Sequence, residues 1–574
     1  MAPRKRRFHG QEGVGSLASM PLDAGGVAHV AHLRATLEAS GVKATVVRPT
    51  LSGGATPQQP SLALANVPTL ESLSEERASD APRAGFEYDG ATVRAQIAFD
   101  APVQLYGGGQ AAGNLLRTGR ALELWNTDSY RYGEHTPALY SSHPFALALR
   151  SDGSCVGVLA DSIRRGVVRF ASDGVEFAFE DEPFDVWLLE GAHPRDVLRA
   201  LTELTGRIEL PPLWSLGYHQ CRWSYMDEAE VRELARKLRS KHIPCDAIWL
   251  DIDHMDRQRS FTWDAARFPD PTKLIADLRE QGFRVVATVD PGLAVARGYA
   301  PYDSGLAGAH FVLDAAGTPA KGRVWPGICH FPDFTRGATR DWWAGLVESF
   351  AACGVAGLWN DMNEPSVFRT PTRTLPMSAQ HRGLGGGTHA KFHNLYGQLM
   401  AQATREGLLD TQPTERPFVL TRASHVGGAR FAATWTGDNQ ATWDDLRWSI
   451  PMVLSLGLSG QPFSGADIGG FDGDPSGELF ARWFELGAYL PFARGHSDKS
   501  ACRKEPWSFG GEIERAVKAA LERRMQLMPT LYTLFHEAAA SGAPIARPMF
   551  FADARDPALR DVDDQFMLGA DLVV

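Results

Sequence analysis

The hydrophobic positions of the chain follow one pattern before residue 210 and another after it. Before it, short runs such as 92–99, 146–149 and 167–170 are separated by turn residues and alternate in places between apolar and polar positions. Runs of this kind are typical of an antiparallel β-sandwich. After residue 210, longer apolar runs alternate with amphipathic segments of helical spacing, such as 228–238 and 271–281. This alternation predicts βα units around a parallel sheet.

Eight strand-like runs in the second part of the chain end in polar residues. They span residues 215–220, 247–251, 285–290, 357–361, 418–422, 432–438, 462–467 and 490–496. Eight β-then-α units predict an α/β fold of the (β/α)8 TIM-barrel type. A doubly wound open sheet is the alternative, but it seldom needs eight such strands, and the first run lacks the Gly-rich phosphate turn typical of that fold. The short connection between Arg422 and Asp438 predicts a vestigial helix there, and residues 366–389 predict a long loop over the barrel mouth.

These patterns divide the chain into four predicted parts. Residues 1–85 are interpreted as a basic tail and the start of the N-terminal region, and residues 86–208 as an N-terminal β-sandwich. Residues 209–540 form the predicted catalytic barrel. Residues 541–574 are expected to begin a C-terminal β-domain that is apparently truncated, because the sequence stops inside an apolar strand pattern.

Composition narrows the class of protein. The chain has 574 residues and a formal net charge of −10, so no basic footprint for nucleic acid is expected. No apolar run is long enough to predict a membrane span. The basic start, 4–7, is not followed by the apolar run of a signal peptide, so no export is expected. The six cysteines are scattered without C-x-x-C spacing, which favours a reducing cytoplasm. The oligomeric state stays open.

Two strand ends carry the chemistry that stands out most. One apolar run ends in Trp359-Asn360-Asp361, and a later one ends in Trp435-Thr436-Gly437-Asp438. Each Asp could simply cap the helix that follows its strand. Two carboxylates at the mouth of one barrel, each beside a Trp, are also the minimum equipment for cleaving a glycosidic bond, and we favour this interpretation.

The other predicted strand ends make the barrel mouth acidic and aromatic. The polar residues at these ends are Asp251, Asp253, Asp290, Glu364, Arg422, Asp467 and His496, and the nearby aromatic residues are Trp223, Trp325, Trp359, Trp435 and Phe471. Carboxylates accept hydrogen bonds from hydroxyls, and aromatic faces stack on C–H groups, so a neutral polyol suits this lining. A metal site is the rival hypothesis for clustered carboxylates. The acids are dispersed among several strands without paired histidines, so neither a metal nor a cofactor is expected.

A family resemblance becomes visible in these motifs. The motifs are Leu216-Gly217-Tyr218-His219-Gln220-Cys221-Arg222-Trp223-Ser224-Tyr225, Trp249-Leu250-Asp251-Ile252-Asp253, Val324-Trp325-Pro326-Gly327, Trp359 to Pro365, Trp435 to Asn439, Gly465-Ala466-Asp467-Ile468-Gly469-Gly470-Phe471 and Arg494-Gly495-His496-Ser497. The chain resembles glycoside hydrolase family 31, the α-glucosidase family with its glucosidase II-like members, over residues 86–574. Tyr106-Gly107-Gly108-Gly109-Gln110 departs from the Gly-Leu-Gly-Glu that the family often has.

The resemblance implies a role for each matching residue. Asp361 stands where the family has its nucleophile, and Asp438 stands at the general acid/base. The substrate-binding residues that it implies are Asp251, Ile252, Arg422, His496, Asp467, Trp325, Trp359, Trp435, Met362, Phe471 and Trp223, with Asp128 of the N-terminal part touching the leaving sugar.

The expected activity is that of a retaining exo-α-glucosidase acting on α-glucoside oligosaccharides through a covalent glucosyl-enzyme. A transglucosidase, an α-xylosidase or an α-glucan lyase would use the same site. A non-catalytic carbohydrate-binding protein is the alternative from another class. A retaining mechanism predicts carboxyl groups about 5–5.5 Å apart.

Overall fold

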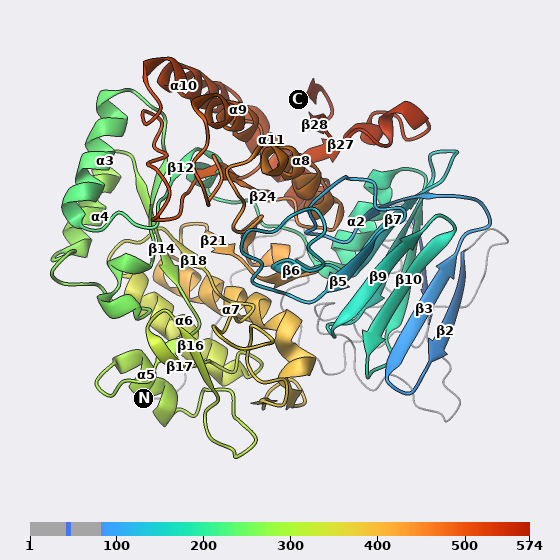
Figure 1. Cartoon of the computed structure of the whole chain (residues 1–574), viewed down its shortest axis with the longest axis horizontal. Coiled ribbons are helices and arrows are strands. Elements are labelled where there is room, and N and C mark those ends of the chain that lie inside the picture. The colour runs from blue at the N-terminus through green and yellow to red at the C-terminus, as the bar shows by residue number, and fades with distance from the viewer. Residues whose placement is uncertain (1–41, 48–81) are drawn as a thin grey trace.

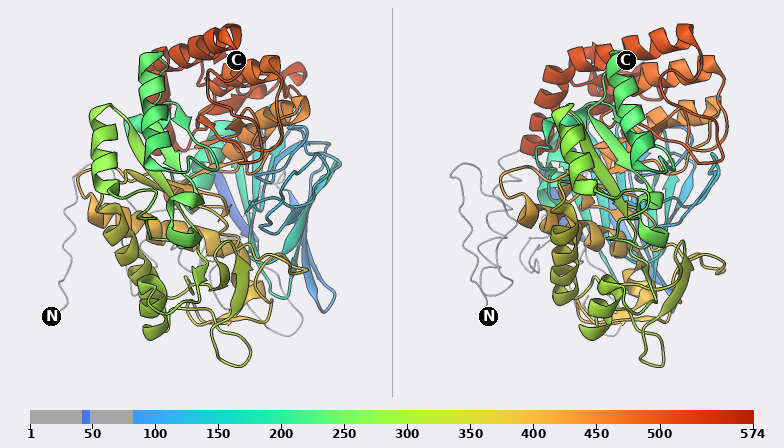
Figure 2. Two further views of the ribbon diagram at one scale, coloured as in Figure 1. Left: turned by 60° about the vertical axis from the view of Figure 1, so that its left-hand side comes forward. Right: turned by 90° about the vertical axis from the view of Figure 1, so that its left-hand side faces the viewer.

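The computed structural model describes residues 42–47 and 82–574. A β-sandwich and a barrel lie side by side, and long helices cover the outside of the barrel (Figure 1). The views in Figure 2 show the same two bodies from other sides, with the C-terminal helices along one edge of the barrel. The basic tail was predicted within residues 1–85, and most of that stretch, residues 1–41 and 48–81, lies outside the described residues.

The sandwich consists of two five-stranded sheets in which all neighbouring strands are antiparallel. The first sheet has the order β1 (Lys43–Val47), β11 (Asp185–Gly191), β8 (Cys155–Asp161), β7 (Phe145–Leu149) and β4 (Gln104–Gly107). The second has the order β2 (Arg83–Tyr88), β3 (Thr92–Ala98), β10 (Gly174–Glu180), β9 (Gly166–Ala171) and β5 (Ala121–Leu124). β3 alternates buried and more exposed residues, as a strand with one face on a core does. Both β1 and the start of β2 lie N-terminal to residue 86, where the sandwich was expected to begin.

The barrel is closed by parallel strands, and all eight predicted strands are present. They are β12 (His219–Gln220), β13 (Ala247–Leu250), β14 (Arg284–Val289), β18 (Gly357–Asn360), β21 (Val419–Thr421), β23 (Ala433–Trp435), the pair β24 (Ser464–Gly465) and β25 (Asp467–Ile468), and β26 (Arg494–Gly495). β24 pairs with β23, while β25, two residues later, pairs with β26. β26 pairs in turn with β12, so this interrupted seventh strand completes the circle.

Helices follow most of the strands. They are α3 (Glu228–Ser240), α4 (Pro271–Glu280), α5 (Ala300–Ala307), α6 (Gly337–Ala351), α7 (His389–Thr411), α8 (Trp443–Leu458), α9 (Gly477–Gly487), α10 (Gly511–Gln526) and α11 (Met528–Ser541), while α2 (Pro194–Thr205) packs against the sandwich. Between β21 and β23 only the short helix η5 (Gly428–Arg430) is found, as the short connection predicts. In the described part of the chain, no helix combines the length and apolar character needed to cross a membrane.

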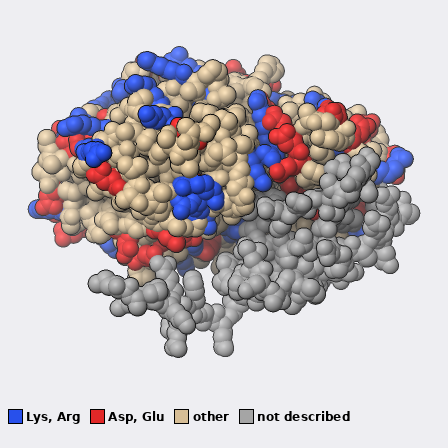
Figure 3. Space-filling view, turned by 90° about the horizontal axis from the view of Figure 1, so that it is seen from below, with Lys and Arg blue, Asp and Glu red and all other residues tan. Residues whose placement is uncertain are grey.

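Short β-elements complete the fold. They are the sheet of β15 (Leu293–Ala294), β17 (Gly327–His330) and β16 (Lys321–Val324), the hairpin of β19 (Gln380–His381) and β20 (Gly387–Thr388), and the C-terminal sheet of β27 (Ala546–Pro548), β28 (Phe566–Leu568) and β29 (Leu572–Val573). One parallel pair, β6 (Ser141–Ser142) with β22 (Ser424–His425), joins the N-terminal part directly to the barrel. On the face seen from below, basic and acidic side chains are interspersed (Figure 3).

Candidate active site

The carboxyl ends of the barrel strands bring the predicted acids to one mouth. Asp361 directly follows β18, Asp251 follows β13, Asp290 follows β14, and Asp438 comes three residues after β23. The strands themselves are almost wholly buried, so their side chains are fixed by packing on both faces. Polar residues placed at such ends are held on a rigid scaffold, which is what catalysis at this face of a barrel requires.

One arginine holds four carboxylates together. The guanidinium of Arg422, which directly follows β21, makes a bidentate pair with Glu364 at 2.8 and 3.0 Å. Its Nε lies 3.2 Å from Asp361 Oδ1, and its Nη1 lies 3.7 Å from Asp438 Oδ2. Its Nη2 lies 3.4 Å from Asp128 Oδ2. Both predicted catalytic acids therefore contact the same cation.

The N-terminal part supplies Asp128 to this centre. Asp128 Oδ2 accepts a hydrogen bond from Ser366 Oγ at 2.8 Å. Two residues earlier, the side-chain amide of Asn126 donates to the carbonyl oxygens of Asn394 at 3.0 Å and Ser424 at 3.1 Å. The segment that carries Asp128 is thus anchored to the barrel, as the resemblance implies for a loop that reaches the leaving sugar.

Burial and charge set the protonation of the two acids. Burial raises the pKa of Asp438 well above its usual range; Arg422 opposes this shift, while Asp128 and Asp361 add to it. Burial also raises the pKa of Asp361, and Arg422 opposes that shift too. Burial alone would lower the pKa of Arg422, but the four carboxylates outweigh it, so the guanidinium stays charged. One cation cannot keep four neighbouring carboxylates ionised at low dielectric, so a proton remains among them.

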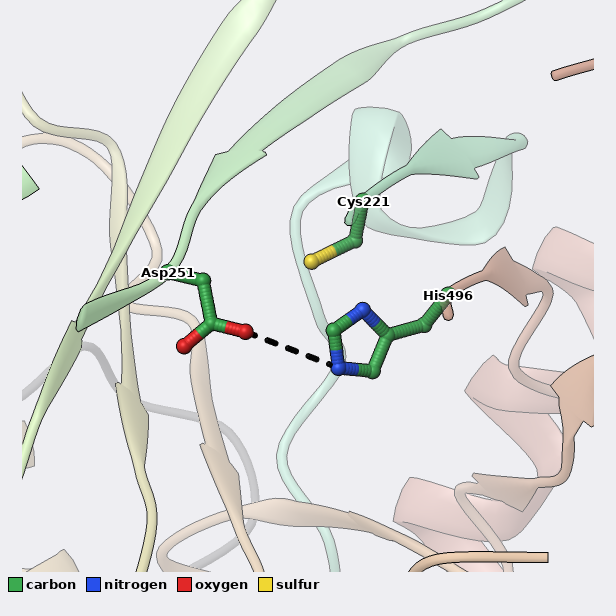
Figure 4. A group of neighbouring side chains, drawn as sticks. All are labelled: Cys221, Asp251 and His496. Atoms are coloured by element: carbon green, nitrogen blue, oxygen red, sulfur yellow. Dashed lines mark ion pairs between the residues drawn. The ribbon is translucent and has the colours of Figure 1, made fainter. Parts of the chain in front are cut away.

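Ile252 and three buried polar side chains close the site on the side of β12, β13 and β26. Asp251 accepts a hydrogen bond from the backbone of Ile252 at 2.7 Å, and its other oxygen lies 3.7 Å from His496 Nε2 (Figure 4). Cys221 turns its sulfur toward the same imidazole, and the three residues offer potential ligand atoms within 4.8 Å of one another. Burial, together with Arg494, lowers the pKa of His496 well below its usual range, so the ring is neutral.

Asp467 lies deeper than the sequence suggests. Arg494 donates to its Oδ1 from Nε at 3.0 Å and from Nη2 at 2.8 Å, and both side chains are fully buried. The same guanidinium lies 4.6 Å from the ring of Trp359 and 5.0 Å from that of Trp435. Arg494 therefore links Asp467 to the two tryptophans whose rings it contacts.

The remaining aromatic residues stand higher in the mouth. Trp223 and Trp325 meet edge to face at 5.1 Å, and both are only half-buried. Phe471 lies 4.9 Å from the ring of His496. Met362 adopts a φ of 56°, a left-handed conformation that is rare outside glycine, and so places its sulfur 3.1 Å from Arg422 Nη2. Phe471 and Met362 thus contact residues of the predicted site, and Trp223 joins it through the backbone of Ser497, next to His496, with Trp325 packed on its ring.

Three residues have roles that sequence reasoning did not assign. Glu364 holds Arg422, Arg494 holds Asp467, and Asp290 is 2% exposed while both its carboxylate oxygens lack a hydrogen-bond partner among the described residues. Glu364 and Asp290 were expected at the mouth without a function. Arg494 could have been found from strand periodicity, because it lies two positions before His496 and side chains two apart share a face.

Comparison with known proteins shows the family to which this fold belongs. The model described as the TIM-barrel domain of glycosyl hydrolases family 31 matches residues 208–534. The chain belongs to glycoside hydrolase family 31. A second model, the family 31 N-terminal galactose mutarotase-like domain, matches residues 24–168.

Relatives within family 31 cover most of the chain. It is 43% identical to alpha-glucosidase 2 of Bacillus thermoamyloliquefaciens over 82% of this chain and 60% of that protein. It is 40% identical to human neutral alpha-glucosidase AB over 79% of this chain and 51% of that protein. The chain therefore spans about half to three fifths of the length of these curated relatives.

Solved structures of family 31 match the fold. The glucosidase II alpha subunit gives a TM-score of 0.80 at 36% identity and covers 83% of this chain and 55% of that chain. The family 31 alpha-glucosidase of Bacteroides thetaiotaomicron gives a TM-score of 0.77 at 43% identity and covers 88% and 81%.

Proposed function

We propose that the protein is a retaining exo-α-glucosidase that removes terminal α-linked glucose from oligosaccharides. The observation that carries this proposal is the contact of one guanidinium, that of Arg422, with both Asp361 and Asp438 at the ends of β18 and β23. Double displacement requires one carboxylate that is ionised and a second carboxyl group that is protonated. Arg422 favours the ionised form of Asp361, and burial favours the protonated form of Asp438.

In the first step, ionised Asp361 attacks the anomeric carbon and a covalent glucosyl ester forms as the glycosidic C–O bond breaks. Arg422 contacts Asp361 directly and favours its charged form. Asp438 begins protonated, since burial and neighbouring carboxylates raise its pKa, and gives this proton to the leaving oxygen. In the second step Asp438 accepts a proton from water as the water oxygen attacks the anomeric carbon, the ester bond to Asp361 breaks, and glucose and the Asp361 carboxylate are released.

The remaining residues bind and orient the sugar. Asp251 and Asp290 are buried carboxyls with raised pKa values, and both can exchange hydrogen bonds with hydroxyls of the terminal glucose. Neutral His496, beside Asp251, can donate a hydrogen bond to a sugar hydroxyl or accept one from it. Cys221, Asp251 and His496 are each less than a tenth exposed and close one side of the site, which favours a terminal sugar over an internal one. Asp128 faces the departing sugar.

The substrate class rests on the relatives. The two relatives described above bear the name alpha-glucosidase, and one structural neighbour, a glucosidase II alpha subunit, was solved bound to a ligand written alpha3-Glc2. We also propose a cytoplasmic location, because all six cysteines are free thiols. Cell fractionation followed by immunoblotting tests it, and recovery of the protein outside the cytoplasm contradicts it.

Proton NMR of a maltose digest tests the function. We expect α-glucose to appear first from the non-reducing end, before mutarotation produces the β-anomer. Initial β-glucose contradicts retention. An unsaturated or keto product identifies a lyase, longer glucosides identify a transferase, and turnover of α-xylosides in place of maltose identifies a xylosidase.

A further inference from the structure

Three buried histidines form a row behind the segment that carries Asp128. His381 comes from β19, and His389 and His393 come from α7; each is at most 2% exposed. At the inner end, His381 Nδ1 lies 3.0 Å from a carboxylate oxygen of buried Asp333. His381 Nε2 lies 3.1 Å from His389 Nδ1, so the hydrogen bonds continue from one ring to the next.

The row continues to the N-terminal part of the chain. His389 Nε2 lies 3.1 Å from His393 Nδ1, and the hydroxyl of Thr374 lies 3.0 Å from the first nitrogen and 3.3 Å from the second. His393 Nε2 then lies 2.7 Å from the backbone carbonyl oxygen of Asn126. We call this series, from Asp333 through His381, His389, Thr374 and His393 to Asn126, the histidine chain.

The histidine chain is one hydrogen short when its rings are neutral. Five contacts follow one another from Asp333 through Thr374 to the carbonyl of Asn126, and each needs one hydrogen between its two heavy atoms. The direct contact of His389 Nε2 with His393 Nδ1 lies beside Thr374 and shares a hydrogen with this path, so it is not counted separately. A carboxylate and a carbonyl stand at the two ends, and both only accept. Three neutral imidazoles and one hydroxyl supply four hydrogens. In any tautomer, two lone pairs therefore face each other at one contact, and such an unsatisfied buried pair is costly.

One additional proton satisfies every contact. With His381 as the imidazolium, its two N–H groups donate to Asp333 and to His389 Nδ1. His389 then donates from Nε2 to Thr374, the Thr374 hydroxyl donates to His393 Nδ1, and His393 donates from Nε2 to the carbonyl of Asn126. The carboxylate of Asp333 neutralises the added charge at 3.0 Å, as a buried ion requires.

The charges around the histidine chain favour this position of the proton. Burial lowers the pKa of His389 well below its usual range and that of His393 to about 3, so neither of these rings is the one that is charged. Arg165 lies near His393 and opposes a cation there. At the other end, burial raises the pKa of Asp333, but its hydrogen bond with His381 is among the contacts that outweigh burial and lower the pKa overall. Arg382 Nε lies 4.0 Å from Asp333, and the phenol of Tyr396 meets the ring of His381 edge to face. Arg336, whose backbone N–H donates to the carbonyl oxygen of Asp333, adds positive charge beside Arg382.

The outer end of the histidine chain reaches the catalytic centre through a short path. Asn126 precedes Asp128 by two residues, and Trp125 stacks on the ring of His393 at 3.9 Å. Asp128 in turn contacts Arg422, which holds both catalytic acids. We propose that one proton held by the histidine chain fixes the segment 125–128 and so positions Asp128 over the leaving-sugar side of the site. His381, His389 and His393 are then positioning residues. The effect on catalysis rests on the proposed function, whereas the effect on the segment does not.

The sign of the pH dependence follows from the hydrogen count. The folded state gains hydrogen bonds from the proton, so the chain stabilises the segment at low pH. This stabilisation is lost as the pH rises past the value at which the folded chain releases the proton. If one proton is released on opening, the opening equilibrium of the segment rises about tenfold per pH unit between the pKa of the open segment and that of the folded chain, and it levels off above the folded value.

Asp333→Asn is the decisive variant. The new amide N–H₂ supplies the missing hydrogen to His381 Nδ1, while its oxygen still accepts from the backbone N–H of Arg382, which lies 2.8 Å from Asp333 Oδ2 in the native protein. The Thr335 hydroxyl, which donates to Asp333 Oδ1 in the native protein, can turn to accept the second amide hydrogen. The chain is then complete without a charge. Asp333→Ala is the matched control, because it removes the partner and supplies no hydrogen.

Hydrogen exchange measured by mass spectrometry on the peptide covering residues 124–130 reports how strongly the backbone amides of segment 125–128 are protected. In the native protein we expect protection, corrected for intrinsic exchange, to fall by up to about tenfold per pH unit over the interval in which the segment releases a proton on opening, and to level off above it. The Asp333→Asn variant is expected to show constant protection over this interval, and Asp333→Ala to show low protection throughout. Equal pH dependence in the native protein and the Asp333→Asn variant overturns the proposal.

Kinetics on two substrates test the link to catalysis. For maltose, kcat/KM of the native protein is expected to fall several-fold more than that of the Asp333→Asn variant over the pH interval in which the native segment loses its protection. The leaving group of an aryl glucoside does not need the sugar contact of Asp128. For this substrate, kcat/KM of the native protein and of the Asp333→Asn variant is expected to depend on pH in the same way. If no α-glucoside is turned over, the proposed function fails, while the exchange experiment still decides whether the histidine chain holds the proton.

Discussion

Two buried arginines at the barrel mouth, Arg422 and Arg494, differ in the number of carboxylates that each one contacts. Arg422 contacts four carboxylates, and three of these, Asp128, Asp361 and Asp438, keep between 16 and 19% of their side-chain surface exposed. Arg494 pairs with Asp467 alone, fully buried and surrounded by aromatic rings. The first centre has more acids than one cation can neutralise, and the second is balanced.

The difference explains why chemistry is expected at one centre and support at the other. An excess of carboxylates raises pKa values and keeps a proton available for transfer, and the partial exposure lets a substrate reach it. A balanced, dry ion pair has no proton to give, but it fixes the orientation of the rings around it. The predictions below test this division from the largest expected effect to the smallest.

Asp361→Asn is expected to have the largest effect. Removing the nucleophile should lower kcat on maltose by about 10⁴-fold or more without unfolding the protein. Steady-state rates and thermal unfolding check this. Asp196→Asn, which weakens the capping box of α2 on the sandwich, is the control and should keep the rate. A variant at position 361 with a tenth of native activity would contradict the assignment.

Asp438→Asn should lower the rate in a way that depends on the leaving group. Loss of the general acid is expected to cost about 10²–10⁴-fold for maltose. An aryl glucoside with an acidic phenol needs no protonation on departure, so formation of the glucosyl-enzyme should be much less affected. Pre-steady-state measurement of phenol release separates this step from hydrolysis, and equal losses for both substrates would argue against an acid role.

Asp467→Asn should affect the fold more than the chemistry. It leaves the Arg494 cation buried without a counter-ion, a change expected to destabilise the protein by about 3–5 kcal/mol. Thermal unfolding should show a clear drop in the melting temperature. The double variant Asp467→Leu with Arg494→Met removes both charges and should recover much of the loss. Failure of the double variant to recover would show that the pair has a role beyond charge balance.

Glu364→Gln should give the smallest change, seen mainly as a shift in the pH profile. Without this carboxylate, Arg422 acts more strongly on Asp361 and Asp438, and one source of repulsion is lost. Both effects favour the ionised forms, so the pKa values fall. The limb at which Asp438 loses its proton should move to lower pH by about half a unit to one unit. Measurement of kcat/KM against pH shows this, and a shift to higher pH contradicts it.

The sequence predicted the barrel and its chemistry because both depend on local patterns. Each barrel strand is an apolar run that ends in polar residues, and the run near Trp359 could be recognised without knowing its neighbours. Parallel strands place their carboxyl ends together, so Asp361 and Asp438 were expected to meet. The short connection that holds η5 could be predicted from length alone. β1 was missed because it lies far in sequence from β11, the strand with which it pairs.

What the sequence alone determined, then, is the order of strands, the closure of the barrel and the identity of the two acids at its mouth. Only the tertiary structure decided that Arg422 contacts four carboxylates, that Asp467 lies in the floor with Arg494, and that three histidines link Asp333 to Asn126. These contacts join residues distant along the chain, and they depend on how loops close over the barrel and which charges become buried. Burial determines the protonation state of an ionisable group, and the sequence pattern does not show which side chains will be buried together.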